Sequence, residues 1–125
     1  MNQQTTQQTS IQITLDLQKT LHHSPVFDSV FQQAVTAAFA TLGEPAQRML
    51  FNCLERKFGV PQNGVSTDPA AFAAAIEDIL GPAAAQLIEA RIIHVLHNQV
   101  PSFKYIAAGG ELFFLDYVEA LKDFL

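Results

Sequence analysis

The chain has 125 residues and a formal net charge of −5, with 49% apolar and 15% charged residues. This length is typical of one domain, and the apolar content excludes a chain that is disordered throughout. The acidic balance disfavours a nucleic-acid binder, which needs a basic surface to neutralise phosphates. A single cysteine excludes an internal disulfide, so we expect a reduced, cytoplasmic setting.

The first ten residues are rich in Gln and Thr. Such a polar tract buries too little apolar area to offset the cost of ordering its backbone. We therefore predict a disordered tail over residues 1–10 and a single helical domain over residues 11–125. The tail lacks the positive and apolar regions of a signal peptide. No apolar run reaches the about 18 residues that would span a membrane, so we expect no membrane partner.

Residues 11–17 alternate strictly between apolar and polar side chains. Alternation favours a strand, and a lone strand needs a partner for its backbone groups. Three interpretations stay open. The segment pairs with a short extended piece near residues 100–106, it pairs with a second copy across a dimer axis, or it is the first amphipathic helix. We assign its apolar residues to dimerisation: Ile11, Ile13, Leu15 and Leu17.

Apolar spacing and end signals predict two helices in the next part of the chain. Ser24 and Pro25 start the first helix and Gly43 closes it. Its apolar positions follow helical spacing: Phe27, Val30, Phe31, Ala34, Val35, Ala38, Phe39 and Leu42. The second helix starts at Pro45 and ends before Gly59. Its inward face comprises Ala46, Met49, Leu50, Cys53, Leu54 and Phe58, and Phe51 lies off this stripe.

We predict a loop over residues 60–68, because this stretch is rich in turn-forming residues. Thr67 or Asp68 then caps a third helix, which starts at Pro69 and is stopped by Gly81. Its stripe comprises Phe72, Ile76, Ile79 and Leu80. Pro82 opens a fourth helix that Pro101 ends, with these residues inward: Ala84, Leu87, Ile88, Ile92, Val95 and Leu96.

A fifth helix is predicted over residues 111–125. Its apolar residues are Leu112, Phe113, Leu115, Val118, Leu121, Phe124 and Leu125. The pattern as a whole predicts a mainly all-α fold, a compact bundle of about five helices. The bundle includes a short N-terminal β-strand if residues 11–17 form the strand that their alternation favours.

His94 and His97 lie three residues apart on the fourth helix, close to Glu89. A transition-metal site needs three or four ligands, which this group reaches only if His22 and His23 fold back onto it. We interpret the two helical histidines as solvent-facing and expect neither a metal nor another cofactor.

No motif for catalysis stands out in the sequence. Glu77 and Asp78 are adjacent, so on a helix they diverge by about 100° and do not face one site. The third helix lacks Lys and Arg, which disfavours a DNA-reading helix. We expect no enzyme activity and no nucleic-acid partner.

Several apolar residues lie off the predicted apolar stripes, so that apolar side chains surround most of the circumference of their helices. Either they belong to a central helix that the others wrap, or they meet a partner. The unpaired alternating segment favours a homo-oligomer. The candidate partner-binding residues are Phe113, Phe114, Ile93 and Phe51.

Residues 45–99 carry a recognisable arrangement of helix boundaries and apolar positions. It comprises Met49-Leu50-Phe51, Lys57-Phe58-Gly59-Val60, Asp68-Pro69 and the apolar positions from Phe72 to Ile92. This stretch resembles the Nitrosopumilus output domain family. The resemblance implies a small helical domain of archaeal signalling proteins without a known catalytic site, and it implies no functional residue.

We therefore expect a non-enzymatic signalling or regulatory module that binds an unknown protein partner and acts as a homodimer. The alternative is a helical pocket protein that binds a small apolar ligand, with a pocket lined by Phe27, Phe31, Phe39 and Phe72. A sizeable internal cavity would favour this alternative, and a close-packed core would disfavour it.

Overall fold

The computed structural model of the chain describes residues 25–106 and 112–125. This part of the chain contains five α-helices and one 3₁₀ turn, and no strand. The elements are α2 (Pro25–Ala40), α3 (Glu44–Phe58), η1 (Gln62–Gly64), α4 (Pro69–Leu80), α5 (Pro82–Gln99) and α6 (Phe114–Phe124). The prediction of a mainly all-α helical bundle is confirmed. The predicted tail and the assigned dimerisation residues Ile11, Ile13, Leu15 and Leu17 lie outside the described residues.

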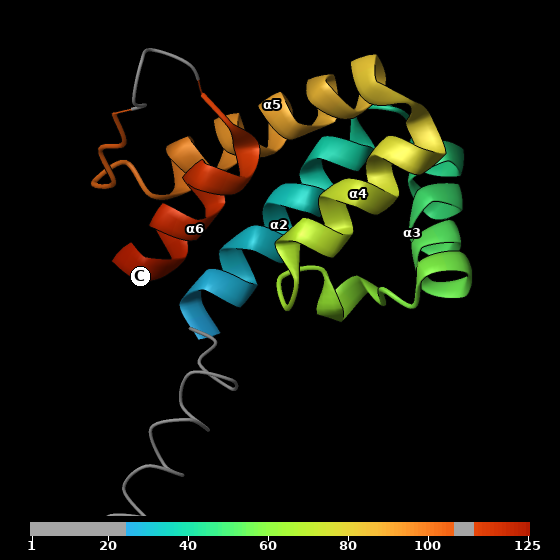
Figure 1. The fold of residues 1–125 in the computed structure, drawn as a ribbon, viewed down its shortest axis with the longest axis horizontal. Coiled ribbons are helices and arrows are strands. Elements are labelled where there is room, and N and C mark those ends of the chain that lie inside the picture. Colours follow the sequence, from blue (N-terminus) through green and yellow to red (C-terminus); the bar gives the residue numbers. More distant parts are fainter. Residues whose placement is uncertain (1–24, 107–111) are drawn as a thin grey trace, which may run out of the picture.

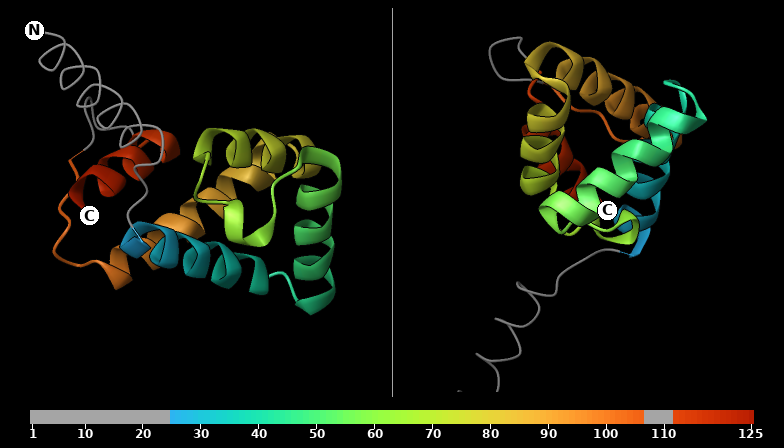
Figure 2. Two further views of the ribbon diagram at one scale, coloured as in Figure 1. Left: turned by 90° about the horizontal axis from the view of Figure 1, so that it is seen from below. Right: turned by 90° about the vertical axis from the view of Figure 1, so that its right-hand side faces the viewer.

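Helices α2, α4 and α5 form the middle of the bundle. Helix α5 packs on both α2 and α4. Helix α3 packs against α2 and α4 at one end, and α6 packs against α4 and α5 at the other end (Figures 1 and 2). The C-terminal helix is therefore placed beside α5, where the candidate site lies.

The helix boundaries follow local chemistry. The Asp68 carboxylate accepts a hydrogen bond from the backbone N–H of Ala71 at 3.1 Å, which caps α4. Gly59 ends α3 with a left-handed φ of 68°, a conformation that a glycine adopts without steric cost. Gly81, with φ 84°, is the single residue between α4 and α5. This tight connection allows the two helices to pack on each other.

Phenylalanine rings join three helices at the centre of the core. The ring of Phe31 on α2 stacks with Phe27 at 5.4 Å between ring centroids. It also meets Phe72 of α4 edge-on at 5.9 Å and Phe114 of α6 at 6.4 Å. Such offset and edge-on contacts add to the free energy gained by burying the rings. Phe31 therefore links α2 to both α4 and α6.

In the predicted apolar stripes of the first, second and fourth helices, three residues are exposed. Helix α2 ends at Ala40, where the Thr41 hydroxyl donates to the carbonyl of Ala38, so Leu42 lies in the following turn and is 41% exposed. Leu87 is 64% exposed, because it lies about 100° around the helix from the buried Ile88. Met49 is turned away in the same manner from the buried Leu50.

The last helix is shorter than predicted. It begins at Phe114, not at residue 111, and Phe113 precedes it with extended backbone angles of φ −98° and ψ 132°. Apolar spacing does not reveal this start, because Leu112 and Phe113 also fit a helical stripe. The shorter helix leaves these two residues in a non-helical segment beside α5.

Candidate functional site

The four candidate partner-binding residues differ in exposure. Phe113 is 56% exposed, and Ile93 and Phe51 are half-buried. The Phe51 ring packs on Phe39 at 5.0 Å, as a second buried contact of α3. Phe114 is 7% exposed and belongs to the core around Phe31. The expectation that Phe114 is a surface contact is therefore corrected, because the start of α6 turns its ring inward.

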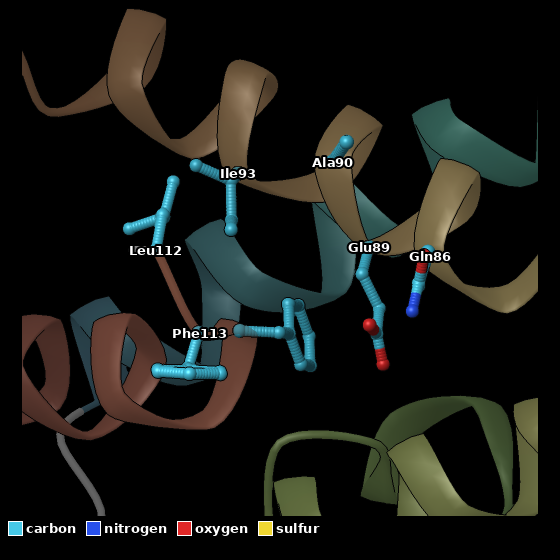
Figure 3. Close-up of a pocket in the computed structure, with 7 residues that line it drawn as sticks. Gln86, Glu89, Ala90, Ile93, Leu112 and Phe113 are labelled. Carbon is cyan, nitrogen blue, oxygen red and sulfur yellow. The ribbon is translucent and has the colours of Figure 1, made fainter. Parts of the chain in front are cut away.

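Ile93 and Phe113 meet at a hollow between α5 and the segment that leads into α6 (Figure 3). We call it the α5–α6 hollow. It has a volume of about 510 Å³. Its lining comprises Gln86, Glu89, Ala90, Ile93, Leu112, Phe113 and Phe114. The structure thus brings three of the predicted contact residues to one place, with Phe114 on the buried side of the hollow, and leaves Phe51 away from it.

The two walls of the hollow arise from different local structures. On α5 the buried residues Ile88 and Ile92 face the core, and the residues that follow them, Glu89 and Ile93, share the adjoining flank. The opposite wall is extended at Phe113. Successive side chains of an extended backbone point to opposite sides, so Phe113 faces the hollow and solvent while Phe114 enters the core.

The hollow is apolar at one end and polar at the other. Figure 3 shows Ile93 and Leu112 together at one end, whereas Glu89 and Gln86 occupy the other end. Leu112 is 52% exposed, so the apolar end is open to solvent. An occupant with matching chemistry therefore needs both an apolar part and a polar part.

Glu89 is the charged group of the hollow. Partial burial raises the pKa of its carboxyl group above the usual range, and repulsion from Glu77 on α4 raises this pKa further. Within the described residues, Glu89 forms neither a hydrogen bond nor an ion pair. The single ion pair of this part of the chain joins Arg48 and Glu44 on α3. Glu89 is thus a partly desolvated carboxylate with no cation beside it in the described chain.

A second hollow lies between α2 and α5. It measures about 370 Å³ and is lined by Ala37, Ala38, Thr41, Leu87, Ala90, Arg91, His94 and Val95. A third, of about 400 Å³, is lined by residues of α2 and η1: Gln32, Gln33, Thr36, Ala37, Ala40 and Gln62. Neither of these two hollows contains a carboxylate or a phenylalanine ring.

The phenylalanines predicted to line a ligand pocket form closed core contacts instead. Phe27, Phe31, Phe39 and Phe72 are each 0% exposed. Phe31 and Phe39 both pack against Phe72. None of the four lines any of the three hollows described above. The geometry therefore gives no support to a pocket for a small apolar ligand at this position.

His94 lies beside Asn98 on α5, with 3.3 Å between the His94 Nε2 and the Asn98 Nδ2. No group of three or more His, Cys, Asp or Glu side chains with metal-binding geometry occurs among residues 25–106 and 112–125. His22 and His23 lie outside these ranges.

Sequence reasoning missed four residues of the hollow, Gln86, Glu89, Ala90 and Leu112. It considered Glu89 as a neighbour of the two histidines and placed Leu112 inside a helix. For Glu89 a signal exists, because a carboxylate four residues before an off-stripe isoleucine shares a helix flank with it. For Leu112 the apolar spacing carries no such signal.

Comparison with known proteins finds no match to this chain among family models, curated proteins or solved structures. No helix in the described part of the chain has the length and apolar character needed to cross a membrane.

Proposed function

We propose that this chain is a non-enzymatic protein–protein interaction module of the signalling or regulatory type, that it acts as a homodimer, and that the α5–α6 hollow is its contact surface. The observation that carries the proposal is the pair of neighbouring exposed residues Leu112 and Phe113 beside the half-buried Ile93.

The exposed apolar side chains of the hollow adjoin one another. Single exposed apolar side chains are normal on a protein surface, whereas adjoining ones around a hollow are typical of interaction sites. Burial of apolar surface contributes roughly 25 cal/mol per Å². Aromatic side chains are also enriched in the cores of interfaces. Phe113 is therefore the residue from which we expect the largest contribution to association.

The signalling assignment has a separate and more general support. The α5 wall of the hollow lies within residues 45–99, the stretch that resembles the Nitrosopumilus output domain family. The absence of a known catalytic site in that family agrees with an interaction role. The homodimer is proposed because one chain presents an open apolar surface and carries an alternating apolar segment at residues 11–17.

The proposal is tested by measuring the dimer dissociation constant of the full chain and of two matched variants. Phe113→Ser removes the exposed ring of the hollow. Phe124→Ser is the control, because Phe124 is also a phenylalanine near one end of α6 and is 50% exposed, but it does not line the hollow.

We expect light scattering after size-exclusion chromatography to show a concentration-dependent dimer of the unmodified chain. Phe113→Ser should raise the dissociation constant at least about tenfold, as expected for loss of a well-packed aromatic contact. Phe124→Ser should leave this constant within about twofold. A chain that stays monomeric at all concentrations, or a dimer that Phe113→Ser leaves intact, would overturn the proposal.

A further inference from the structure

The α5–α6 hollow has a defined spacing between its apolar and acidic parts. Glu89 and Ile93 lie four residues apart on α5, which places them about 6 Å apart along the helix axis. A complementary occupant therefore presents a cation and an apolar side chain about 6 Å apart on one of its faces.

The chain itself contains a segment with this arrangement, before α2. The alternating residues Ile11, Ile13, Leu15 and Leu17 are followed at the same spacing by Lys19. An extended segment would place Leu17 and Lys19 on one side, about 7 Å apart. A helical segment would place Leu15 and Lys19 on one side, about 6 Å apart. The match to the hollow thus does not depend on which conformation the segment takes.

We propose, building on the proposed function above, that residues 11–19 of a second copy of this chain occupy the α5–α6 hollow. The aliphatic side chains of the segment lie against Ile93, Leu112 and Phe113, and Lys19 pairs with Glu89. Each copy contributes one segment and one hollow, so the contact is made twice in a symmetric dimer.

Lys19 is the cation whose position beside apolar residues has the required spacing, and three of the other cations already have contacts within the described chain. Arg48 is paired with Glu44, and Arg91 donates a hydrogen bond to the Thr41 hydroxyl. Lys122 lies over the ring of Phe27 at 5.9 Å. Lys19 is the cation that directly follows an apolar stripe. Bringing it to Glu89 supplies a counter-charge to a carboxylate that has none within the described chain.

The geometry of α2 indicates that the segment comes from a second copy and not from the same chain. Hydrogen bonds from Arg91 to Thr41 and from Gln99 to Gln33 show that α5 runs antiparallel to α2. Glu89, near the middle of α5, therefore lies level with the C-terminal end of α2. Figure 1 shows this arrangement, with α2 beginning far from the first half of α5.

The length of the connecting backbone favours a second copy over the same chain. Helix α2 has 16 residues and is about 24 Å long. The six steps from Lys19 to Pro25 span at most about 20 Å when fully extended. A Lys19 in the same chain would have to cover the length of α2 and also pass around the bundle, and only its side chain could make up the difference, so the hollow of another copy is easier to reach.

A charge exchange between two full-length variants tests this arrangement. Lys19→Glu and Glu89→Lys each place like charges at the contact in their own homodimers. When the two variants are mixed, each Glu at position 19 meets a Lys at position 89, and each native Lys19 meets a native Glu89. Only a contact between copies restores both pairs in the heterodimer.

The readout is native mass spectrometry with one variant labelled with ¹⁵N, so that the heterodimer has its own mass. Each variant alone should dimerise about tenfold more weakly than the unmodified chain. In an equimolar mixture the heterodimer should exceed its statistical half of the dimer population. Lys57→Glu mixed with Glu89→Lys is the matched control, because Lys57 is an exposed cation on α3, at the end of the bundle away from α6. That mixture should show no such excess.

The outcomes separate this inference from the function on which it rests. A wild-type dimer that Phe113→Ser dissociates, together with a statistical mixture of the charge variants, would overturn the assignment of residues 11–19 and leave the interaction surface standing. A monomeric wild-type chain would overturn both. Should thermal melting show that Glu89→Lys does not fold, Glu89→Gln takes its place, and the dimer of that variant should be insensitive to Lys19→Glu. If Lys19→Glu weakened the dimer equally in the unmodified chain and in the Glu89→Gln variant, the pairing of Lys19 with Glu89 would be contradicted.

Discussion

Phe113 and Phe114 are neighbours in the sequence but face opposite environments, since Phe113 is 56% exposed beside Ile93 and Phe114 is 7% exposed in the core. The extended backbone at Phe113 causes this divergence. The two neighbouring residues thus have different roles: Phe114 anchors α6 to the core, and Phe113 presents an aromatic ring at the surface.

This relationship predicts unequal effects of the same substitution on stability at the two positions. Phe114→Ala should lower the free energy of unfolding by about 3–5 kcal/mol, because it removes a ring packed near Phe31. Phe113→Ala should change the stability of the monomer by about 0.5 kcal/mol or less. Urea denaturation of dilute protein measures both values. Equal losses at the two positions would show that the ring of Phe113 is also buried.

Tyr117 gives a prediction about a buried hydroxyl group. The side chain is 4% exposed, and its hydroxyl oxygen has no hydrogen-bond partner among the described residues. An unpaired buried hydroxyl costs roughly 1–3 kcal/mol. We expect Tyr117→Phe to keep or raise the melting temperature, because the ring contacts with Phe103 and Tyr105 persist. A clear loss of stability would mean that the hydroxyl does have a partner.

The same substitution should alter the response to alkaline pH. Burial raises the pKa of Tyr117 above its usual range. The folded state then holds this proton at pH values where the unfolded state has lost it, so stability falls as the pH rises from the usual tyrosine pKa to the raised one. Tyr117→Phe should remove this part of the alkaline loss, which urea titrations at several alkaline pH values would detect.

The sequence predicts the helices better than it predicts the site. Proline, Asp68 and the glycines at positions 59 and 81 have local effects on the backbone, so their positions predict where α3, α4 and α5 start and stop. The predicted start of α6 at residue 111 is wrong. Leu112 and Phe113 fit an apolar helical stripe, and no capping side chain marks Phe114 as the first helical residue.

The exposure of individual apolar residues depends on packing between distant helices, which spacing does not determine. Leu87 fits the apolar pattern of α5 as well as Ile88 does, yet Ile88 is 2% exposed in the core and Leu87 is 64% exposed at the hollow between α2 and α5. For the same reason, the sequence identifies Ile93 and Phe113 singly as candidate contact residues but does not predict that they line one hollow. That depends on the position of α6 beside α5.

Glu89 provides a test of the electrostatics of the hollow. Its pKa is raised by burial and by Glu77. The folded monomer therefore loses stability as the pH rises from the ordinary glutamate pKa through the raised value, because ionisation is disfavoured in the folded state. Glu89→Gln should stabilise the dilute monomer at neutral pH by a few tenths of a kcal/mol, roughly the size of a screened like-charge pair.

Below both pKa values this gain should vanish, since the carboxyl group is then neutral in the folded and unfolded states alike. Urea titrations at acidic and neutral pH give the comparison. Glu119→Gln is a suitable control, because Glu119 is an exposed glutamate on α6 that does not line the hollow. If Glu89→Gln destabilised the monomer at neutral pH, a favourable partner of the carboxylate would have to exist within the chain.

The cap of α4 gives a prediction for the fold itself. Asp68→Ala removes the acceptor of the Ala71 backbone N–H and should cost about 1 kcal/mol of stability. Asp68→Asn keeps an acceptor oxygen at this position and should retain most of that stability. Thermal unfolding of the two variants measures the difference, and equal losses would show that the hydrogen bond contributes nothing beyond the negative charge.

The native mass of the unmodified chain over a range of concentrations tests the proposed dimer most directly. We predict a dimer of twice 13.7 kDa that dissociates on dilution and whose dissociation constant rises when Phe113 is replaced by serine. A species of 13.7 kDa at every concentration would contradict this prediction.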